Sequence, residues 1–79
     1  MLLSIFSLRK PVLRKEIISV NLKTRVGELT ILDHHRPLVV PLVKGQIRVV
    51  DLKGEETAFP AEGGLVEVRP DNKVSILLN

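Results

Sequence analysis

Apolar and polar residues alternate along most of the chain in short runs that turn-forming residues separate. From Glu16 onward, Ile18, Val20 and Leu22 alternate with polar neighbours, which is the pattern of a β-strand with one face in water. No stretch keeps a helical period for more than a turn or two. The pattern therefore predicts an all-β chain.

Further runs of this kind predict more strands, at residues 2–8, 29–31, 38–43, 46–52, 57–59, 65–69 and 74–78. Glycine and proline mark the turns, since glycine adopts positive φ at little cost and Pro70 is pre-set for the first corner of a tight turn. The run 38–43 is almost wholly apolar, which predicts burial on both faces or an interface. About eight strands at this spacing predict a small antiparallel, flattened β-sandwich or barrel, one domain over residues 1–79.

Composition limits the core that such a fold can build. A chain of 79 residues makes one domain, and it buries only about 60% of its unfolded surface. Phe6 and Phe59 are the only aromatic residues, so the core must consist of Val, Leu and Ile, which favour strands. The chain has no cysteine, so neither a disulfide nor a thiolate metal site supplements that core. We therefore expect contact with a partner protein to supplement this core.

The apolar runs are too short to place the chain in a bilayer. None approaches the roughly 18 to 20 residues that a membrane-spanning helix needs. Residues 1–8 are too short for a signal peptide, and their basic neighbours follow rather than precede them. We therefore expect a soluble, intracellular chain.

Charge is distributed unevenly. Residues 1–48 hold nine Lys/Arg against three Asp/Glu, a balance of +6, whereas residues 49–79 hold three against six, a balance of −3. Four cationic residues cluster around Pro11, namely Arg9, Lys10, Arg14 and Lys15. Such a patch is compatible with nucleic acid or an anionic membrane surface. No aromatic residue interleaves the charges to stack on bases, so we favour a solvated face and keep a small nucleic-acid-binding barrel as the alternative.

The stretch Gly27–Leu42 carries a carboxylate, both histidines and a proline-bracketed apolar run, which is the chemistry of a docking loop. Asp33, His34 and His35 form a three-residue candidate metal cluster, but adjacent histidines point to opposite faces in a strand, and a polar loop is the favoured interpretation. No serine or threonine lies beside a histidine base, and the glycines are too scattered for a phosphate loop. We predict no catalytic, cofactor-binding or metal-binding residue.

Five blocks, in order along the chain, resemble one known family. They are Gly27-Glu28-Leu29-Thr30-Ile31, His35-Arg36-Pro37-Leu38, Lys44-Gly45-Gln46-Ile47-Arg48-Val49, Gly63-Gly64-Leu65-Val66-Glu67-Val68 and Val74-Ser75-Ile76-Leu77. Their order and spacing resemble the amino-terminal domain of the epsilon subunit of rotary F-type ATP synthases. That family has Gly-Glu-Leu-Gly-Ile, Pro-Gly-His-Ala-Pro-Leu, a Lys-Pro-Gly turn before an apolar-Arg-apolar strand, a Ser-Gly-Gly bend and a closing Val-Thr-Val-Leu strand.

The resemblance implies a flattened β-sandwich on the central rotor stalk. In the family this domain does no chemistry; it binds the gamma subunit on one side and the polar loops of the membrane-embedded c-ring on the other. It therefore implies a non-catalytic coupling subunit without a cofactor. It also implies a peripheral place in a membrane complex, at the cytoplasmic face of a bacterial inner membrane, without insertion into the bilayer and without nucleic acid as a partner.

The resemblance also assigns contacts to single residues. Because the Gly-Glu-Leu segment faces the c-ring loops, it implies c-ring contact for Gly27, Glu28 and Leu29, with Glu28 beside an arginine of the ring. The segment around the family's His and Pro-Leu lies on the surface shared with gamma, so gamma contact is implied for four residues, His35, Pro37, Leu38 and Val40. A solvated turn is the alternative for Glu28, and core positions are the alternative for Leu38 and Val40.

The chain departs from the family pattern at the turn after the third predicted strand. His34 replaces a glycine that allows positive φ, so the turn must differ or carry strain of about 1 kcal/mol. Arg36 replaces an alanine and makes the contact there more electrostatic. Many family members continue into a carboxy-terminal helical hairpin, whereas this sequence stops at Asn79. Either the natural protein is a short form or the sequence is a truncated piece, so we carry over neither autoinhibition nor nucleotide binding.

Overall fold

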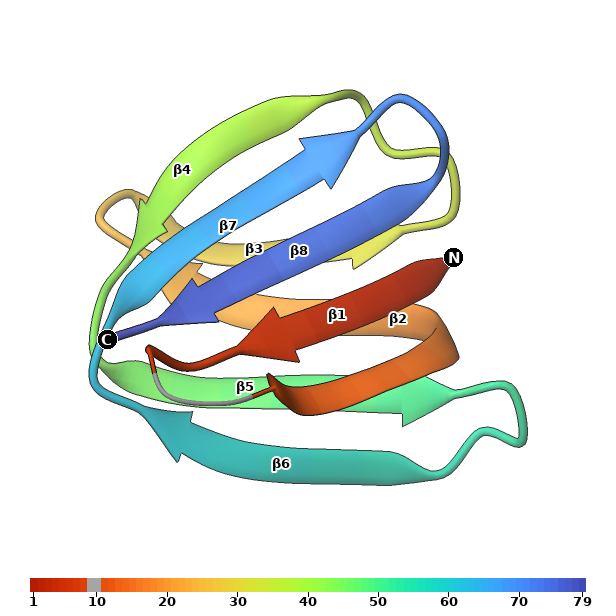
Figure 1. The fold of residues 1–79 in the computed structure, drawn as a ribbon, viewed down its shortest axis with the longest axis horizontal. Coiled ribbons are helices and arrows are strands. Elements are labelled where there is room, and N and C mark those ends of the chain that lie inside the picture. Colours follow the sequence, from red (N-terminus) through yellow and green to blue (C-terminus); the bar gives the residue numbers. More distant parts are fainter. Residues whose placement is uncertain (9–10) are drawn as a thin grey trace.

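Eight strands account for most of the chain, as the alternating pattern predicts, and the computed structural model describes residues 1–8 and 11–79. The prediction of an all-β fold is confirmed (Figure 1). The strands are β1 (Leu2–Phe6), β2 (Pro11–Thr24), β3 (Gly27–Leu32), β4 (Leu38–Leu42), β5 (Gly45–Asp51), β6 (Glu56–Ala61), β7 (Gly64–Arg69) and β8 (Lys73–Leu78). No helix long and apolar enough to cross a bilayer occurs among these residues.

The strands follow the order β4-β7-β8-β1-β2-β5-β6, with β3 also paired to β2. The long strand β2 belongs to both halves of this curled sheet, because its first part pairs with β1 and its second part with β3 and β5. The result is two packed layers, with β7 and β8 in front of β3 and β1 in front of β2 in Figure 1. Strands β1 and β8 pair in parallel, with Leu2 opposite Lys73, whereas the other pairs of described strands are antiparallel.

The core between the layers consists of aliphatic side chains, as the composition requires. Ten Val, Leu and Ile side chains are fully buried, among them Leu3, Ile31 and Val66. Burying one such side chain contributes about 1.5–3 kcal/mol. Phe59 packs against this core only partly buried, and Phe6 is exposed. The framework that carries the loops is therefore a thin sandwich without an aromatic centre.

One inward position in β2 differs from the predicted alternation. The pairing of β2 with β5 shifts register between Ile17 and Ser19, and such a bulge places one extra residue on the bulged strand. Ile17 is consequently fully buried, whereas Ile18 is 43% exposed. The prediction that Ile18 faces inward with Val20 and Leu22 is wrong for Ile18 alone.

The apolar run around β4 is buried on one face only within this chain, so burial on both faces by the chain itself is wrong, and the predicted alternative of an interface stays a prediction. Strand β4 lies at one edge of the sheet and pairs with β7 only. Leu38 and Val40 pack against the core, but Val39 is 63% exposed because no layer covers the outer face there. Burial of that face would need an interface.

The predicted bend at Gly63-Gly64 and the turn at residues 70–72 are both present. Gly64 has a φ of 155°, and a Cβ added there would collide with the carbonyl oxygen of Leu77. Asn72 has a φ of 60° in the turn between β7 and β8, a conformation that asparagine tolerates better than most residues. These two turns set the position of β7, on which β4 is built.

Candidate docking surface

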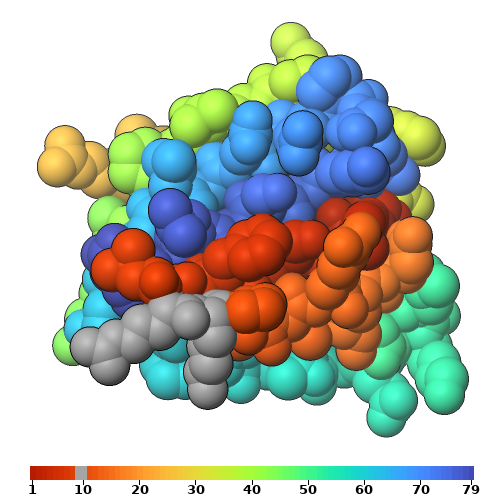
Figure 2. Space-filling model, in the orientation of Figure 1, coloured from red at the N-terminus to blue at the C-terminus, as the bar shows by residue number. Residues whose placement is uncertain are grey.

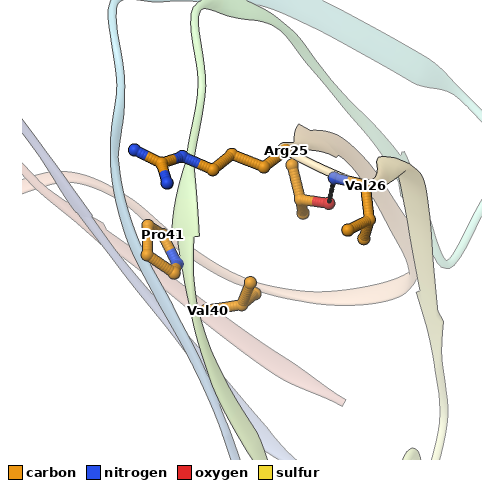
Figure 3. Close-up of a pocket in the computed structure, with 5 residues that line it drawn as sticks. Arg25, Val26, Val40 and Pro41 are labelled. Carbon is orange, nitrogen blue, oxygen red and sulfur yellow. Dashed lines mark hydrogen bonds between the residues drawn. The ribbon is translucent and has the colours of Figure 1, made fainter.

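The first predicted contact segment, Gly27, Glu28 and Leu29, begins at the tip of the β2–β3 hairpin; we call it the Glu28 end. Local bonds shape the tip, because the Thr24 hydroxyl donates to the Gly27 carbonyl oxygen at 2.9 Å and accepts from the Val26 N–H at 3.3 Å (dashed in Figure 3). Gly27 has a φ of 120° with open space around it. This tip therefore depends on residues within one turn.

Side chains at the Glu28 end point in different directions. Glu28 is exposed and belongs to none of the ion pairs formed within residues 1–8 and 11–79. Leu29 packs partly buried against the core. Val26, beside Gly27, is 97% exposed. The tip thus presents one uncompensated carboxylate and one bare apolar side chain to solvent.

A pocket joins the hairpin tip to β4. It has a volume of about 410 Å³ and is lined by Thr24, Arg25, Val26, Val40 and Pro41. In Figure 3 the Arg25 side chain extends from the hairpin toward β4, near Pro41. The pocket brings Val40 next to the hairpin residues that precede the Glu28 end.

The second predicted contact segment comprises His35, Pro37, Leu38 and Val40; we call it the His35 end. It begins after a turn in which His34 has a φ of 60°. The sequence predicted that a histidine in place of glycine would either change the turn or carry strain. His34 adopts the left-handed conformation, which costs a non-glycine residue about 1 kcal/mol. The His34 N–H donates to Asn72 Oδ1 at 2.7 Å, and the His35 N–H donates to the Leu32 carbonyl oxygen at 3.2 Å.

Asp33, just before this turn, accepts two long-range hydrogen bonds on Oδ1. The Met1 ammonium donates at 2.7 Å and Asn72 Nδ2 donates at 3.3 Å. Hydrogen bonding from that ammonium, followed by Asn72, lowers the pKa of Asp33 below its ordinary value. The same bond to Asp33 is the main cause that raises the pKa of the Met1 ammonium, and Glu16, at 3.6 Å, adds to it.

The candidate metal cluster is not assembled. No group of three or more His, Cys, Asp or Glu side chains with metal-binding geometry occurs in the part of the chain that the structure describes. Asp33 is occupied as described, and His35 Nδ1 lies 2.8 Å from the Arg36 carbonyl oxygen, to which it can only donate. The three side chains are therefore not brought together as a metal-binding group among the described residues, which agrees with the favoured interpretation of a polar loop.

Strand β4 divides its side chains between two faces. Leu38 lies opposite buried Val68, and Val40 lies opposite buried Val66, so both point into the sandwich. This agrees with the core alternative for the two residues. His35 is half-buried, Pro37 is exposed, and β4 exposes Val39 and Pro41 on its outer face. Sequence reasoning did not identify these two residues as outward-facing. In a strand that is apolar at every position, the sequence does not indicate which alternate side chains face the solvent.

The outer face also carries an apolar row that no sequence motif marks. Pro41 lies opposite Leu65, Leu65 opposite Leu77, and Leu77 opposite Phe6. All four are exposed. The row crosses β4, β7, β8 and β1, and Figure 2 views the face formed by the last three. Only the strand register aligns these residues, which are scattered along the chain.

The predicted basic cluster is only partly visible. Arg9 and Lys10 lie outside the described residues. Arg14 is exposed, and Lys15 Nζ lies 3.7 Å from Asp51 Oδ2 in the neighbouring strand β5. A cation that is paired in this way contributes less to a uniform basic surface, so the described residues do not strengthen the nucleic-acid alternative.

Comparison with known proteins identifies relatives over the whole domain. Residues 1–79 match the family described as "ATP synthase, Delta/Epsilon chain, beta-sandwich domain". The mitochondrial ATP synthase subunit delta of Yarrowia lipolytica is 35% identical over 63 residues, which are 80% of this chain and 39% of that protein. The ATP synthase epsilon chain of Bacillus thuringiensis is 43% identical over 68 residues, 85% of this chain and 49% of that protein.

A solved structure shares the fold. A chain in the mitochondrial ATP synthase of Euglena gracilis (OSCP/F1/c-ring) superposes with a TM-score of 0.91 at 23% identity. The match covers 96% of this chain and 48% of that one. This chain therefore spans about half, or less, of the length of the proteins that it matches.

Proposed function

The chain belongs to the delta/epsilon chain family of ATP synthases, and we propose that it is a non-catalytic subunit of the central rotor stalk. In this role it docks on the gamma subunit and on the c-ring and couples ion translocation to ATP synthesis. The observation that carries the proposal is the match of the family's β-sandwich domain to residues 1–79. The fold adds support, since its conspicuous surfaces are apolar rows and loop ends rather than a catalytic cleft.

For the c-ring contact we propose the Glu28 end. Glu28 is exposed and unpaired within the described residues, so it can meet an arginine without first breaking an ion pair. Gly27 lets the chain turn into β3 with open space around it, and partly buried Leu29 fixes the segment to the core. A free carboxylate on an anchored backbone suits recognition of a cation.

For the gamma contact we propose the His35 end, extended by the outer residues of β4. His35 and Pro37 lie in the loop before the strand, whereas Leu38 and Val40 hold the strand against the core. Val39 and Pro41 offer the adjoining apolar surface. A docking partner would bury this face, as the interface alternative for this apolar run expects.

We place this subunit on the surface of an energy-transducing membrane, peripheral to it through the complex. The cytoplasmic face of a bacterial inner membrane is the proposed location. The relative from Yarrowia lipolytica is mitochondrial, so an organellar source fits the same proposal.

The test of the proposal is association with purified gamma subunit. We expect a stable complex at micromolar concentrations in gel filtration and calorimetry. Absence of a complex under these conditions would contradict the assignment. A labelled oligonucleotide, titrated at physiological salt, tests the alternative, because a nucleic-acid-binding barrel would bind it tightly with a steep salt dependence.

The c-ring contact is tested by charge reversal, Glu28→Lys. We expect weaker binding to isolated c-rings at low salt, and a smaller difference from the unaltered chain as salt screens the charges. Glu56→Lys changes an exposed carboxylate outside the Glu28 end that also belongs to none of the ion pairs among the described residues; it is the matched control and should leave c-ring binding unchanged. Equal effects of the two variants would favour a solvated turn for Glu28.

A further inference from the structure

Asn72 joins three segments that lie far apart in the sequence. Its Oδ1 accepts from the His34 N–H at 2.7 Å, and its Nδ2 donates to Asp33 Oδ1 at 3.3 Å. Its backbone carbonyl oxygen accepts from the Leu2 N–H at 3.2 Å. The amino terminus, the β3–β4 loop and the β7–β8 turn meet at the same end of the molecule (Figure 1).

The amino terminus completes this arrangement. The Met1 ammonium binds Asp33 Oδ1 at 2.7 Å and the Ile17 carbonyl oxygen at 3.1 Å. We call the set of Met1, Asp33, His34 and Asn72 the clasp. Each member contacts another over at least 32 residues of sequence, so the clasp fixes the β3–β4 loop to the sandwich rather than to its own strands.

The clasp binds the β3–β4 loop at His34, the residue of the loop that has a strained backbone conformation. His34 is held at a φ of 60°, which a non-glycine residue adopts reluctantly. The local bond from the His35 N–H to Leu32 closes the turn, but it does not fix the direction in which the turn leaves β3. The bond from His34 to Asn72 does so, because Asn72 belongs to the opposite layer. Asn72 itself has a left-handed backbone conformation, in which its side-chain amide reaches the β3–β4 loop.

We propose that Asn72 is a positioning residue for docking: it holds the His35 end in the conformation that binds gamma, without needing to contact gamma itself. This inference rests on the proposed function. A loop that is ordered before binding loses less conformational entropy when it binds, and so binds more tightly. Release of the clasp therefore weakens gamma binding while leaving the Glu28 end unchanged.

The decisive variant is Asn72→Gly, which keeps the left-handed turn available and removes only the amide. We expect the Kd for gamma to rise about fivefold to tenfold, in line with the loss of one or two hydrogen bonds. The His34 amide should exchange its hydrogen faster, whereas binding to isolated c-rings should stay unchanged. Asp71→Ala is the matched control in the same turn, since Asp71 contacts Lys73, and it should leave gamma binding and the His34 amide as they are.

An exchange of side chains separates positioning from simple stability. Asp33→Asn combined with Asn72→Asp keeps a hydrogen bond between the two positions and an acceptor for the His34 N–H. We expect this double variant to recover gamma affinity to within about threefold of the unaltered chain, even where Asn72→Gly folds poorly. Failure of the exchange to recover affinity, or unchanged affinity in a folded Asn72→Gly variant, would overturn the inference. Lack of gamma binding by the unaltered chain would instead overturn the proposed function.

Discussion

Only residues 30–34 separate the Glu28 end from the His35 end in the sequence, yet the two ends are held in opposite ways. The hairpin tip at the Glu28 end is shaped by hydrogen bonds among Thr24, Val26 and Gly27, within one turn. The turn before the His35 end is held by Asn72 and by the Met1 ammonium through Asp33. One contact region therefore depends on its own sequence, and the other depends on the completed fold.

This difference has a practical consequence for substitutions. A change at the hairpin tip is expected to act on that turn and on the surface that it presents, because the φ of Gly27 and the Thr24 hydroxyl define the turn locally. A change in the β7–β8 turn reaches the His35 end, although none of its residues lies in the predicted contact segments. Distant substitutions are expected to affect gamma binding and c-ring binding unequally.

The largest expected effect separates the two faces of β4. Leu38→Asp places a carboxylate against the core and should lower the free energy of unfolding by about 3 kcal/mol or more. Val39→Asp, one residue on and 63% exposed, should change it by less than about 0.5 kcal/mol but weaken gamma binding strongly. Urea denaturation and calorimetry measure the two quantities. Similar destabilisation by both variants would mean that β4 has no free outer face.

A smaller effect concerns the strained turn. His34→Val puts a β-branched residue at a φ of 60° and should lower the free energy of unfolding by about 1–2 kcal/mol. His34→Asn should be nearly neutral, because asparagine tolerates this conformation. Val26→Thr, beside the Glu28 end, is the matched control. It should leave the free energy of unfolding unchanged, since Val26 is almost wholly exposed. Urea denaturation of the three variants tests the comparison, and a silent His34→Val would show that the turn relaxes.

The smallest expected effect is a pH dependence confined to the His35 end. The pKa of Asp33 is lowered in the folded chain, so its contribution is present above its unfolded pKa, near 3.8, and is lost as pH falls through the lower folded value. The pKa of the Met1 ammonium is raised. Its contribution is therefore present below its unfolded pKa, near 8.0, and is lost as pH rises through the higher folded value.

NMR chemical shifts of backbone amides measure this dependence. The amides of residues 33–36 should move at both pH extremes, with the hairpin tip 24–27 as the internal reference. Asp33→Asn should remove the acid transition from residues 33–36 and leave residues 24–27 unaffected. Equal movement of both segments would show that the clasp is not local to the His35 end.

The sequence was sufficient for the number and approximate places of the strands and for a turn at His34 that either differs or carries strain. It began the second strand at Glu16, whereas β2 begins at Pro11, and it did not predict the parallel pairing of β1 with β8. Alternation failed at Ile18, because a bulge depends on how β2 pairs with β5. It could not orient β4, where Leu38 and Val39 are equally apolar and only the pairing with β7 decides. The clasp could not be predicted from the sequence either, since nothing in the sequence relates Asn72 to a loop 38 residues earlier. Local rules predict elements, whereas contacts between layers require the register of the sheet.

The parallel pairing of β1 with β8 has a consequence for how the domain is made. Leu2 lies opposite Lys73, so within this domain β1 cannot complete its pairing until β8 has been synthesised. Such distant pairing must overcome a large loop-closure entropy, and folds dominated by it form slowly. Until β8 arrives, both sides of the gap expose unpaired backbone groups that can join another chain. We therefore expect the yield of folded domain to depend on whether β8 pairs with β1 before the exposed edges aggregate. Chaperones or an early-binding partner would reduce that aggregation.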